Sequence, residues 1–264
     1  MGISYVSMQT TYKKKGEILI KYQHVSMSFP DTGKILDDLN FEIKEGEFFV
    51  LVGPSGSGKT TTLKLINRLI EETEGEILFK DKDIKDYPIR DLRLKMGYVL
   101  QEIALFPNLT VAENIALIPE MKKMDKKEIN ENTKKLLSQV DLDPDTYWDR
   151  LPKDISGGEK QRVGILRAIA AGPEVLLMDE PFSALDPISR NSLQDLIVKL
   201  HDELKITTVF VTHDMDEAVK LADRICLMKA GKIIQIGTPS EIINNPETKF
   251  VSKFFSKENG GEDE

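Results

Sequence analysis

A glycine-rich segment directly after a continuous apolar run constrains this chain more than any other feature. The run is Phe48-Phe-Val-Leu-Val52, and the segment is Gly53-Pro-Ser-Gly-Ser-Gly-Lys-Thr60. An apolar run without alternation predicts a strand that is buried on both faces, as in a parallel sheet. A helix is then predicted from Lys59 to about Leu69. The glycines therefore lie in the turn between a strand and a helix, which is where such loops bind phosphate.

The residue types of this loop suit a nucleotide and Mg²⁺. Glycines let backbone N–H groups turn inward around phosphate oxygens. Lys59 would place a positive charge against the β- and γ-phosphates, and Thr60 would offer its hydroxyl to Mg²⁺. The predicted nucleotide-binding residues of the segment are Gly53, Ser55, Gly56, Ser57, Gly58, Lys59, Thr60 and Thr61.

Two carboxylates follow a second apolar run. Val175-Leu-Leu-Met178 predicts another buried strand, and Asp179 and Glu180 come directly after it, at the end of a strand where α/β sheets bind ligands. We predict that Asp179 holds Mg²⁺ through water. Glu180 is predicted to polarise the attacking water, and general-base assistance is typically worth about 10²- to 10⁴-fold in rate. An Asp-Glu pair also ends many strands without a catalytic role, but the phosphate loop in the same chain favours the catalytic interpretation.

A second glycine-containing helix start precedes these carboxylates. In the segment Ile155-Ser-Gly-Gly-Glu-Lys-Gln-Arg162, Ser156 is placed to cap a helix, and the two glycines would expose backbone N–H groups to an anion. Alone, this would be an ordinary capping sequence. Here it gives a chain with one phosphate loop a second anion-binding segment. With it, the sequence resembles the ATP-binding-cassette (ABC) transporter family, whose signature loop has this Ser-Gly-Gly core.

Further motifs of the family occur along the chain in the family's order, and the resemblance extends from about Ile18 to Ile236. Gln101, which follows a predicted strand at Gly97–Leu100, matches the loop glutamine that touches Mg²⁺ and water. Ser183-Ala-Leu-Asp186 matches the loop that links two active sites across a dimer, and this places Asp186 among the nucleotide-binding residues. His213 matches the switch histidine that contacts the γ-phosphate.

The resemblance also suggests an aromatic partner for adenine. Phe29 falls where the family keeps an aromatic residue that stacks on the base. Tyr22 is nearby, and Phe29 could instead be an aromatic residue of the core.

The signature loop departs from the usual family pattern at Ile155, where leucine is common, and at Glu159, where glutamine is commonest. A carboxylate in the first helical turn suits the helix dipole, but its negative charge is less favourable near the phosphates of ATP.

The fold that the resemblance implies is an α/β P-loop NTPase cassette with a RecA-like core, an antiparallel β-lobe and an α-helical lobe. The ATPase domain is expected at 18–256, with the helical lobe at about 86–171. Residues 1–17 would form a disordered extension and 257–264 an acidic tail.

The resemblance also implies a dimer. Two copies would form a homodimer around two ATP molecules. Each ATP would lie between the phosphate loop of one chain and Ser156, Gly157 and Gly158 of the other, and hydrolysis would let the dimer open.

Charge and hydropathy limit the partners of the chain. The net charge is −8 over 264 residues, and because nucleic-acid binding usually needs a basic face, we predict no nucleic-acid partner. No stretch approaches the roughly 18 to 20 apolar residues of a membrane-spanning helix. A single cysteine, Cys226, fits a reducing compartment. With the resemblance, these features predict a peripheral protein at the cytoplasmic face of the cell membrane, bound to transmembrane permease subunits that work with a solute-binding domain or protein.

The sequence around the site is similar to the sequences of one branch of the family, the importers of glycine betaine, carnitine and choline. The similar segments are Thr60–Leu69, Met96–Gln101, Leu105–Pro107 and Ile118-Pro119. Many members of this branch carry regulatory cystathionine-synthase-type domains after the cassette. The sequence ends before such domains, so either this member lacks them or the sequence is an excerpt.

Three other functions stay open on the sequence alone. The chain could belong to an importer of another small solute, such as a polar amino acid. It could be a soluble ABC-type ATPase of translation or DNA repair, although those carry two cassettes or a long coiled-coil insertion, which this sequence lacks. A P-loop kinase of small molecules is the third, but it would leave the segment at Ser156 and His213 unexplained.

Overall fold

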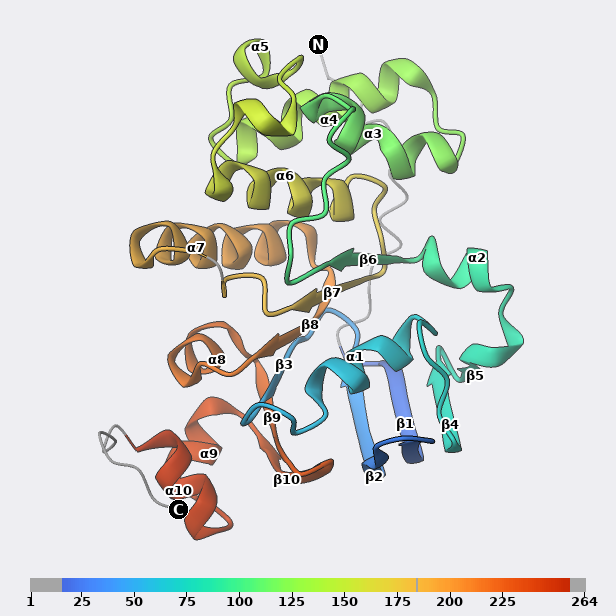
Figure 1. Ribbon diagram of the computed structural model, residues 1–264, viewed down its shortest axis with the longest axis vertical. Coiled ribbons are helices and arrows are strands. Elements are labelled where there is room, and N and C mark those ends of the chain that lie inside the picture. The colour runs from blue at the N-terminus through green and yellow to red at the C-terminus, as the bar shows by residue number, and fades with distance from the viewer. Residues whose placement is uncertain (1–15, 184, 257–264) are drawn as a thin grey trace.

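The computed structural model of the chain describes residues 16–183 and 185–256. A six-stranded sheet lies at its centre, with one group of helices on one face and helix α1 (Lys59–Ile66) with a second, four-stranded sheet on the other (Figure 1). Of the predicted N-terminal extension, 1–17, only the last two residues are described. The predicted acidic tail, 257–264, lies outside the described residues.

Strand β3 (Phe48–Val52) lies inside the six-stranded sheet because both of its faces are apolar. Phe48 and Val50 belong to a core that this sheet shares with helices α6 (Gly157–Ile169), α7 (Pro187–Leu204) and α8 (Met215–Leu221). Phe49 and Leu51 belong to a second core, on the side of α1 and the four-stranded sheet. The predicted burial on both faces is confirmed, since every side chain of β3 is at most 2% exposed.

The strand order of the six-stranded sheet brings the predicted site segments to one edge. The order is β10-β9-β3-β8-β7-β6, and every neighbouring pair is parallel except the hairpin of β9 and β10. Because parallel strands end at the same edge, the segments that follow β3, β6, β7 and β8 lie along it. The strands that join β3 in this sheet are β6 (Met96–Val99), β7 (Val175–Asp179), β8 (Thr207–Thr212), β9 (Arg224–Lys229) and β10 (Lys232–Gly237).

The antiparallel lobe contains longer strands than the sequence predicts. The sequence pattern predicts short strands at Ile18–Tyr22, Leu39–Ile43 and Gly75–Phe79. The third matches β4 (Glu74–Phe79), but β1 spans Ile18–Phe29 and β2 spans Gly33–Lys44. Shifts of register interrupt the pairing of β1 with β2, and they break the simple alternation that marks a strand in a sequence. The sheet has the order β2-β1-β4-β5, with β4 at Glu74–Phe79 and β5 at Lys82-Asp83.

Stacked aromatic rings join the two sheets. The rings of Tyr22 and Phe41 lie 4.3 Å apart between centroids, and those of Phe41 and Phe49 lie 5.5 Å apart. The hydroxyl of Tyr22 donates to the carbonyl oxygen of Thr62 in α1 at 2.7 Å. The four-stranded sheet is thereby held against both β3 and the helix that follows the phosphate loop.

A group of helices covers the upper part of the molecule in Figure 1. Helices α3, α4, α5 and α6 contact one another, and α6 also contacts β6 and α7. Helices α9 and α10 pack near β10 at the opposite end. The helices after α1 are η1 (Ile84–Asp86), α2 (Ile89–Arg93), α3 (Val111–Met121), α4 (Lys126–Gln139), α5 (Pro144–Tyr147), η2 (Pro152–Asp154), α6 (Gly157–Ile169), α7 (Pro187–Leu204), α8 (Met215–Leu221), α9 (Pro239–Asn244) and α10 (Lys249–Phe255).

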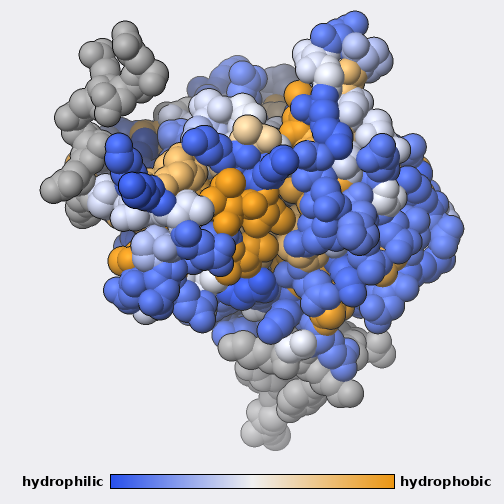
Figure 2. Space-filling view, turned by 90° about the horizontal axis from the view of Figure 1, so that it is seen from below, coloured by the Kyte–Doolittle hydropathy of each residue, from blue (hydrophilic) through white to orange (hydrophobic). Residues whose placement is uncertain are grey.

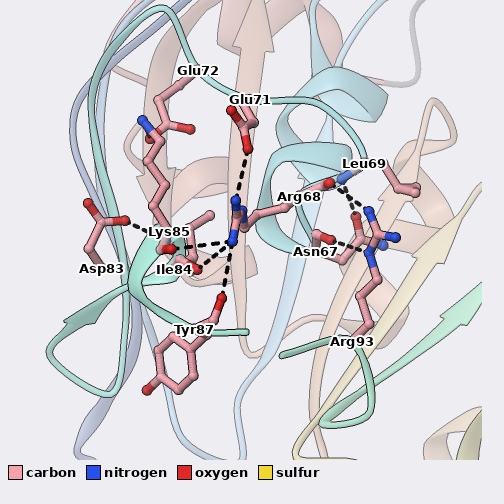
Figure 3. Close-up of polar contacts among 10 residues, drawn as sticks. All are labelled: Asn67, Arg68, Leu69, Glu71, Glu72, Asp83, Ile84, Lys85, Tyr87 and Arg93. Atoms are coloured by element: carbon pink, nitrogen blue, oxygen red, sulfur yellow. Dashed lines mark hydrogen bonds and ion pairs between the residues drawn. The ribbon is translucent and has the colours of Figure 1, made fainter. Parts of the chain in front are cut away.

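Helix α1 ends at Ile66, before the predicted end at Leu69, because arginines hold the following turn (Figure 3). Arg68 adopts a positive φ of 52°, which a helix does not allow. Arg93 of α2 donates to the carbonyl oxygens of Asn67 at 3.1 Å and of Arg68 at 2.7 Å. The guanidinium of Arg68 donates in turn to carbonyl oxygens of the η1 segment. The end of α1 is thereby fixed to the segment that leads into β6.

The surface combines hydrophilic and apolar areas. Seen from below the view of Figure 1, hydrophobic side chains gather near the middle of one face, and hydrophilic side chains surround them (Figure 2). Within residues 16–183 and 185–256, no helix has both the length and the apolar character needed to cross a bilayer.

Candidate nucleotide site

The phosphate loop runs from the end of β3 to the start of α1, and two of its glycines are required by space or conformation. A Cβ on Gly53 would lie 2.1 Å from the carbonyl oxygen of Met228 on β9, so a larger residue cannot fit without moving the backbone. Gly58 has a φ of 99° and precedes α1 without a side-chain cap. The first N–H groups of α1 are therefore left for an anion.

Lys59 lies in the centre of this loop. Its side chain is 5% exposed, and Nζ donates to the carbonyl oxygens of Gly53 at 2.7 Å and of Pro54 at 3.0 Å. Burial lowers the pKa of Lys59, whereas the carboxylates of Glu180 and Asp179 raise it. The loop thus surrounds a buried cation, which is the charge that a phosphate group requires.

The rest of the loop offers hydrogen-bond donors. The hydroxyl of Ser57 is buried and has no hydrogen-bond partner in the described part of the chain. Ser55 and Gly56 are exposed, and Thr61 is partly buried in the first turn of α1. An unpaired buried hydroxyl, an uncapped helix start and a buried lysine fit the triphosphate of a nucleotide.

Thr60 and Asp179 meet across the gap between α1 and β7. The Thr60 hydroxyl donates to Oδ1 of Asp179 at 2.8 Å. Burial raises the pKa of Asp179, which is 5% exposed, while the hydrogen bond from Thr60 lowers it. Hydroxyl and carboxylate oxygens are hard ligands, so the pair fits Mg²⁺.

Gln101 follows the neighbouring strand β6. The register of β6 and β7 pairs Val99 with Met178, so Gln101 and Asp179 both lie just beyond the last paired residues of adjacent strands. Gln101 is exposed and lies in a bend. The structure therefore brings the third predicted metal residue to the same edge as Thr60 and Asp179.

Glu180 and His213 form a hydrogen-bonded pair. They follow β7 and β8, and Nδ1 of His213 lies 3.0 Å from Oε2 of Glu180. The backbone of Glu180 has a positive φ of 44°, and its N–H donates to the carbonyl oxygen of Val211 at 3.0 Å. A residue held at a positive φ next to a ligand site is the kind of strained position found in active sites.

Tyr98 lies beside Asp179, and the sequence analysis did not single it out. Tyr98 on β6 pairs with Leu177 on β7, and because alternate residues share a face, Asp179 is on the same face. The Tyr98 hydroxyl is buried without a hydrogen-bond partner in the part of the chain that the structure describes. Burial, and then the nearby Asp179 carboxylate, raise the pKa of Tyr98. The parallel register of two predicted strands was the signal that could have identified it.

The Ser-Gly-Gly segment starts α6 through a complete capping box. Ser156 accepts from the N–H of Glu159 at 3.3 Å, and the Glu159 carboxylate accepts from the N–H of Ser156 at 2.6 Å. Glu159 also accepts a hydrogen bond from the hydroxyl of Tyr147, and this bond lowers the pKa of Glu159. The glutamate at the position where the family commonly has glutamine therefore has a structural role in this chain. Gly157 and Gly158 form the first turn of α6.

Asp186 caps the neighbouring helix α7. Its carboxylate accepts from the N–H groups of Ile188 at 3.1 Å and Ser189 at 3.0 Å. This cap and the proline at position 187 start α7 at Pro187, whereas the sequence pattern predicts a helix only from Ser192 to Leu204. Asp186 remains exposed.

Phe29 ends β1 and is partly buried against the second core. Tyr22, the other aromatic residue considered for adenine, is only 1% exposed and donates its hydroxyl to Thr62. Tyr22 therefore belongs to the core, and Phe29 is the one of the two that keeps some exposed surface.

Comparisons with known proteins agree on one family. The family model described as "ABC transporter" matches residues 36–183. The chain is 49% identical over 240 residues to the choline transport ATP-binding protein OpuBA of Bacillus subtilis, covering 91% of this chain and 63% of OpuBA. It is 45% identical over 239 residues to the glycine betaine uptake system ATP-binding protein YehX of Escherichia coli, covering 90% of this chain and 77% of YehX. The chain thus spans less than two thirds of the length of OpuBA.

A solved structure gives the same result. The ATP-binding cassette MJ0796, solved as a dimer in a post-hydrolysis state bound to ADP and phosphate, superposes with a TM-score of 0.74 at 33% identity. The match covers 84% of this chain and 99% of MJ0796. The predicted α/β cassette with an antiparallel lobe and a helical lobe is confirmed by this likeness and by the two sheets. By its signature segments, its fold and these matches, the chain belongs to the ABC transporter family.

Proposed function

We propose that this chain is the ATP-hydrolysing subunit of an ABC importer for quaternary amines such as glycine betaine, carnitine and choline. One observation carries the ATPase part of the proposal. The Thr60–Asp179 and Glu180–His213 hydrogen bonds lie at the ends of adjacent strands, next to the phosphate loop. Such an arrangement combines phosphate binding with a carboxylate that can activate water.

Each residue in the proposed reaction has a role that follows from its position. Lys59 and the N–H groups at the start of α1 bind the phosphates of ATP. Thr60, Asp179 and Gln101 would hold Mg²⁺, which when bound neutralises charge on the phosphate oxygens. Glu180 accepts the proton of the attacking water, and His213 contacts the γ-phosphate while its ring bonds Glu180.

We further propose that two copies of the chain close around two ATP molecules. Helix α1 packs on one face of the central sheet and α6 on the other, so the two anion-binding segments of one chain lie apart. This separation fits binding of each segment to a different ATP. Ser156, Gly157, Gly158 and Asp186 would then reach the nucleotide of the partner copy, and Phe29 would stack on adenine in its own chain. The dimeric state of the MJ0796 cassette supports this arrangement.

The relatives indicate the transport system. Both OpuBA and YehX are named for transport of quaternary amines, and we assign the same solute class to this chain. Its partners are transmembrane permease subunits with a solute-binding domain or protein, and its place is the cytoplasmic face of the membrane. We assign the ATPase domain to 18–256, with the helical lobe at about 86–171.

Co-purification and reconstitution test this proposal. The tagged chain is captured from detergent-solubilised membranes, and the proteins that accompany it are identified. The captured complex is then placed in proteoliposomes, and ATP turnover is measured with and without glycine betaine or choline. We expect a permease in stoichiometric amount and a turnover that the quaternary amine stimulates. A ribosome or a DNA-repair complex would contradict the transport role, and stimulation by a polar amino acid alone would contradict the solute class.

A further inference from the structure

Helix α7 presents two polar side chains, one turn apart, to the first turn of α8. Nη1 of Arg190 lies 3.7 Å from Oδ2 of Asp214. Nε2 of Gln194 lies 3.5 Å from Oε1 of Glu217. Residues four apart on α7 and three apart on α8 each share one face of their helix, so the two contacts lie side by side. We call these four residues the α7–α8 clamp.

The clamp is attached to the backbone on both sides of His213 through one hydroxyl. The Thr212 hydroxyl donates to Oε2 of Glu217 at 2.6 Å and accepts from the N–H of Asp214 at 3.0 Å. Thr212 and Asp214 are the two neighbours of His213 in the chain. The Glu217 carboxylate therefore holds the strand end before His213, and through the same hydroxyl it restrains the residue after it.

A small cavity separates the clamp from the catalytic pair. It measures about 50 Å³, and Arg190, Thr212 and Glu217 line it together with Glu180 and His213. Nε of Arg190 is buried and has no hydrogen-bond partner within the described ranges. Glu217 is itself only 6% exposed. Glu217 is thus a buried residue that lines the same cavity as Glu180 and His213.

We propose that Glu217 is a positioning residue, which holds His213 where its ring bonds Glu180 by accepting the hydrogen bond of Thr212 and by anchoring the α7–α8 clamp. This inference deepens the proposed ATPase function, because it assigns a role to a residue that the reaction itself does not touch. Since Asp186 caps the start of α7, the clamp also connects the loop proposed to face the partner copy with the histidine of the same chain.

The position of His213 can be measured directly, because the chain contains only three histidines. In protein carrying ¹⁵N-labelled histidine, the Nδ1 resonance of His213 reports its hydrogen bond to Glu180. The variant His213→Gln identifies the resonance. Glu217→Ala and Thr212→Val remove the two partners of the same hydrogen bond, and Val keeps the shape of Thr. Glu217→Gln keeps an oxygen that can accept from Thr212. Asp216→Asn is the matched control, since Asp216 is the other acidic residue in the first turn of α8 and is exposed.

We expect Glu217→Ala and Thr212→Val to shift the His213 resonance in the nucleotide-free protein. Both should lower kcat for ATP by about 10- to 100-fold, as misplacement of a catalytic group does, while KM for ATP stays unchanged. Glu217→Gln should keep the His213 resonance close to its wild-type position and retain most of the wild-type kcat. Asp216→Asn should match the wild type in both measurements. If Glu217→Ala fails to fold, Thr212→Val tests the same contact.

The outcomes separate this inference from the proposed function. A His213 resonance that stays at its wild-type position in Thr212→Val overturns the inference, whatever the rate of hydrolysis. Equal kcat in Thr212→Val, Asp216→Asn and the wild type also overturns it. A wild-type chain that does not hydrolyse ATP, alone or with its permease, overturns the proposed function instead, and the resonance comparison still decides the role of Glu217.

Discussion

Nδ1 of His213 lies 3.0 Å from Oε2 of Glu180, within a single chain. The two residues differ in exposure, because the His213 side chain is 59% exposed and that of Glu180 is 20% exposed. The ring is therefore open to an incoming phosphate on one side while the carboxylate is sheltered behind it. The pair thus places a carboxylate that can accept a proton beside an exposed ring that can donate to a phosphate oxygen.

Replacing Thr60 by valine is expected to remove the effect of Mg²⁺ on ATP affinity. The hydroxyl that bonds Asp179 is one of the proposed metal ligands, and a hydrogen bond to a charged group contributes about 1.5–3 kcal/mol. Calorimetric titration with ATP, with and without Mg²⁺, measures the difference. Thr60→Ser keeps the hydroxyl and should retain the Mg²⁺ effect. An undiminished effect in Thr60→Val would exclude Thr60 from the metal site.

Arginine at position 156 is expected to prevent ATP-dependent dimerisation while each chain still binds nucleotide. Ser156 is exposed at the start of α6, where a long cationic side chain would fill the space proposed for the partner's ATP. Ser156→Ala is the control, because both variants lose the cap to Glu159, which costs about 0.5–2 kcal/mol. Light scattering with ATP under non-hydrolysing conditions gives the mass. A dimer of normal stability in Ser156→Arg would contradict the arrangement.

Two glycine-to-alanine substitutions should change stability in opposite directions. A Cβ on Gly97 in β6 would lie 2.4 Å from the carbonyl oxygen of Ala168 in α6, whereas no atom outside the helix backbone lies within 4 Å of a Cβ on Gly164. Gly164→Ala should raise the free energy of unfolding by about 0.5–1 kcal/mol, because alanine loses less entropy in a helix. Gly97→Ala should lower it by about 1–3 kcal/mol, as overpacking does. Urea unfolding measures both, and stabilisation by Gly97→Ala would refute the close contact of β6 with α6.

The stability of Glu217→Gln relative to the wild type should rise with pH. Burial raises the pKa of Glu217, and the carboxylate of Asp214 adds to the shift, while the hydrogen bond from Thr212 and the charge of Arg190 oppose it. Below the ordinary pKa of glutamate, Glu217 is protonated in both the folded and the unfolded chain. As pH rises above the ordinary pKa, the unfolded chain releases its proton while the folded chain keeps it up to the raised pKa, so over this interval the wild type loses stability that the glutamine variant keeps.

Urea unfolding between about pH 4.5 and pH 8 tests this expectation. The free energy of unfolding of Glu217→Gln minus that of the wild type should increase across the range. Asp216→Asn, which changes an exposed carboxylate on the same turn, should show no such increase. A difference that falls with pH would mean that the buried environment of Glu217 favours the charged form.

Local patterns in the sequence were sufficient to predict the central strands and the loops that follow them. The runs Phe48–Val52 and Val175–Met178 are strands buried on both faces, because a continuous apolar run fits few other environments. Periodicity did not predict the ends of elements that side chains or turns determine. Asp186 starts α7 early by capping it, and Arg68 and Arg93 end α1.

Contacts between side chains that lie far apart in the sequence could not be predicted from it, because such contacts depend on packing and register. Nothing local to Tyr98 indicates that its hydroxyl is buried on the same face as Asp179. In the sequence, Glu217 looks like any acidic residue in the first turn of a helix. In the structure, it accepts the hydrogen bond of the Thr212 hydroxyl inside the protein.

Steady-state ATP turnover of Glu180→Gln against the wild type tests the central claim most directly. Glutamine keeps the shape of Glu180 but cannot accept the proton of the attacking water, so turnover should fall by about 10²- to 10⁴-fold. Binding of ATP should persist, and size-exclusion chromatography should show a dimer that holds ATP. Hydrolysis at the wild-type rate in this variant would contradict the account, because Glu180 would then not be the general base.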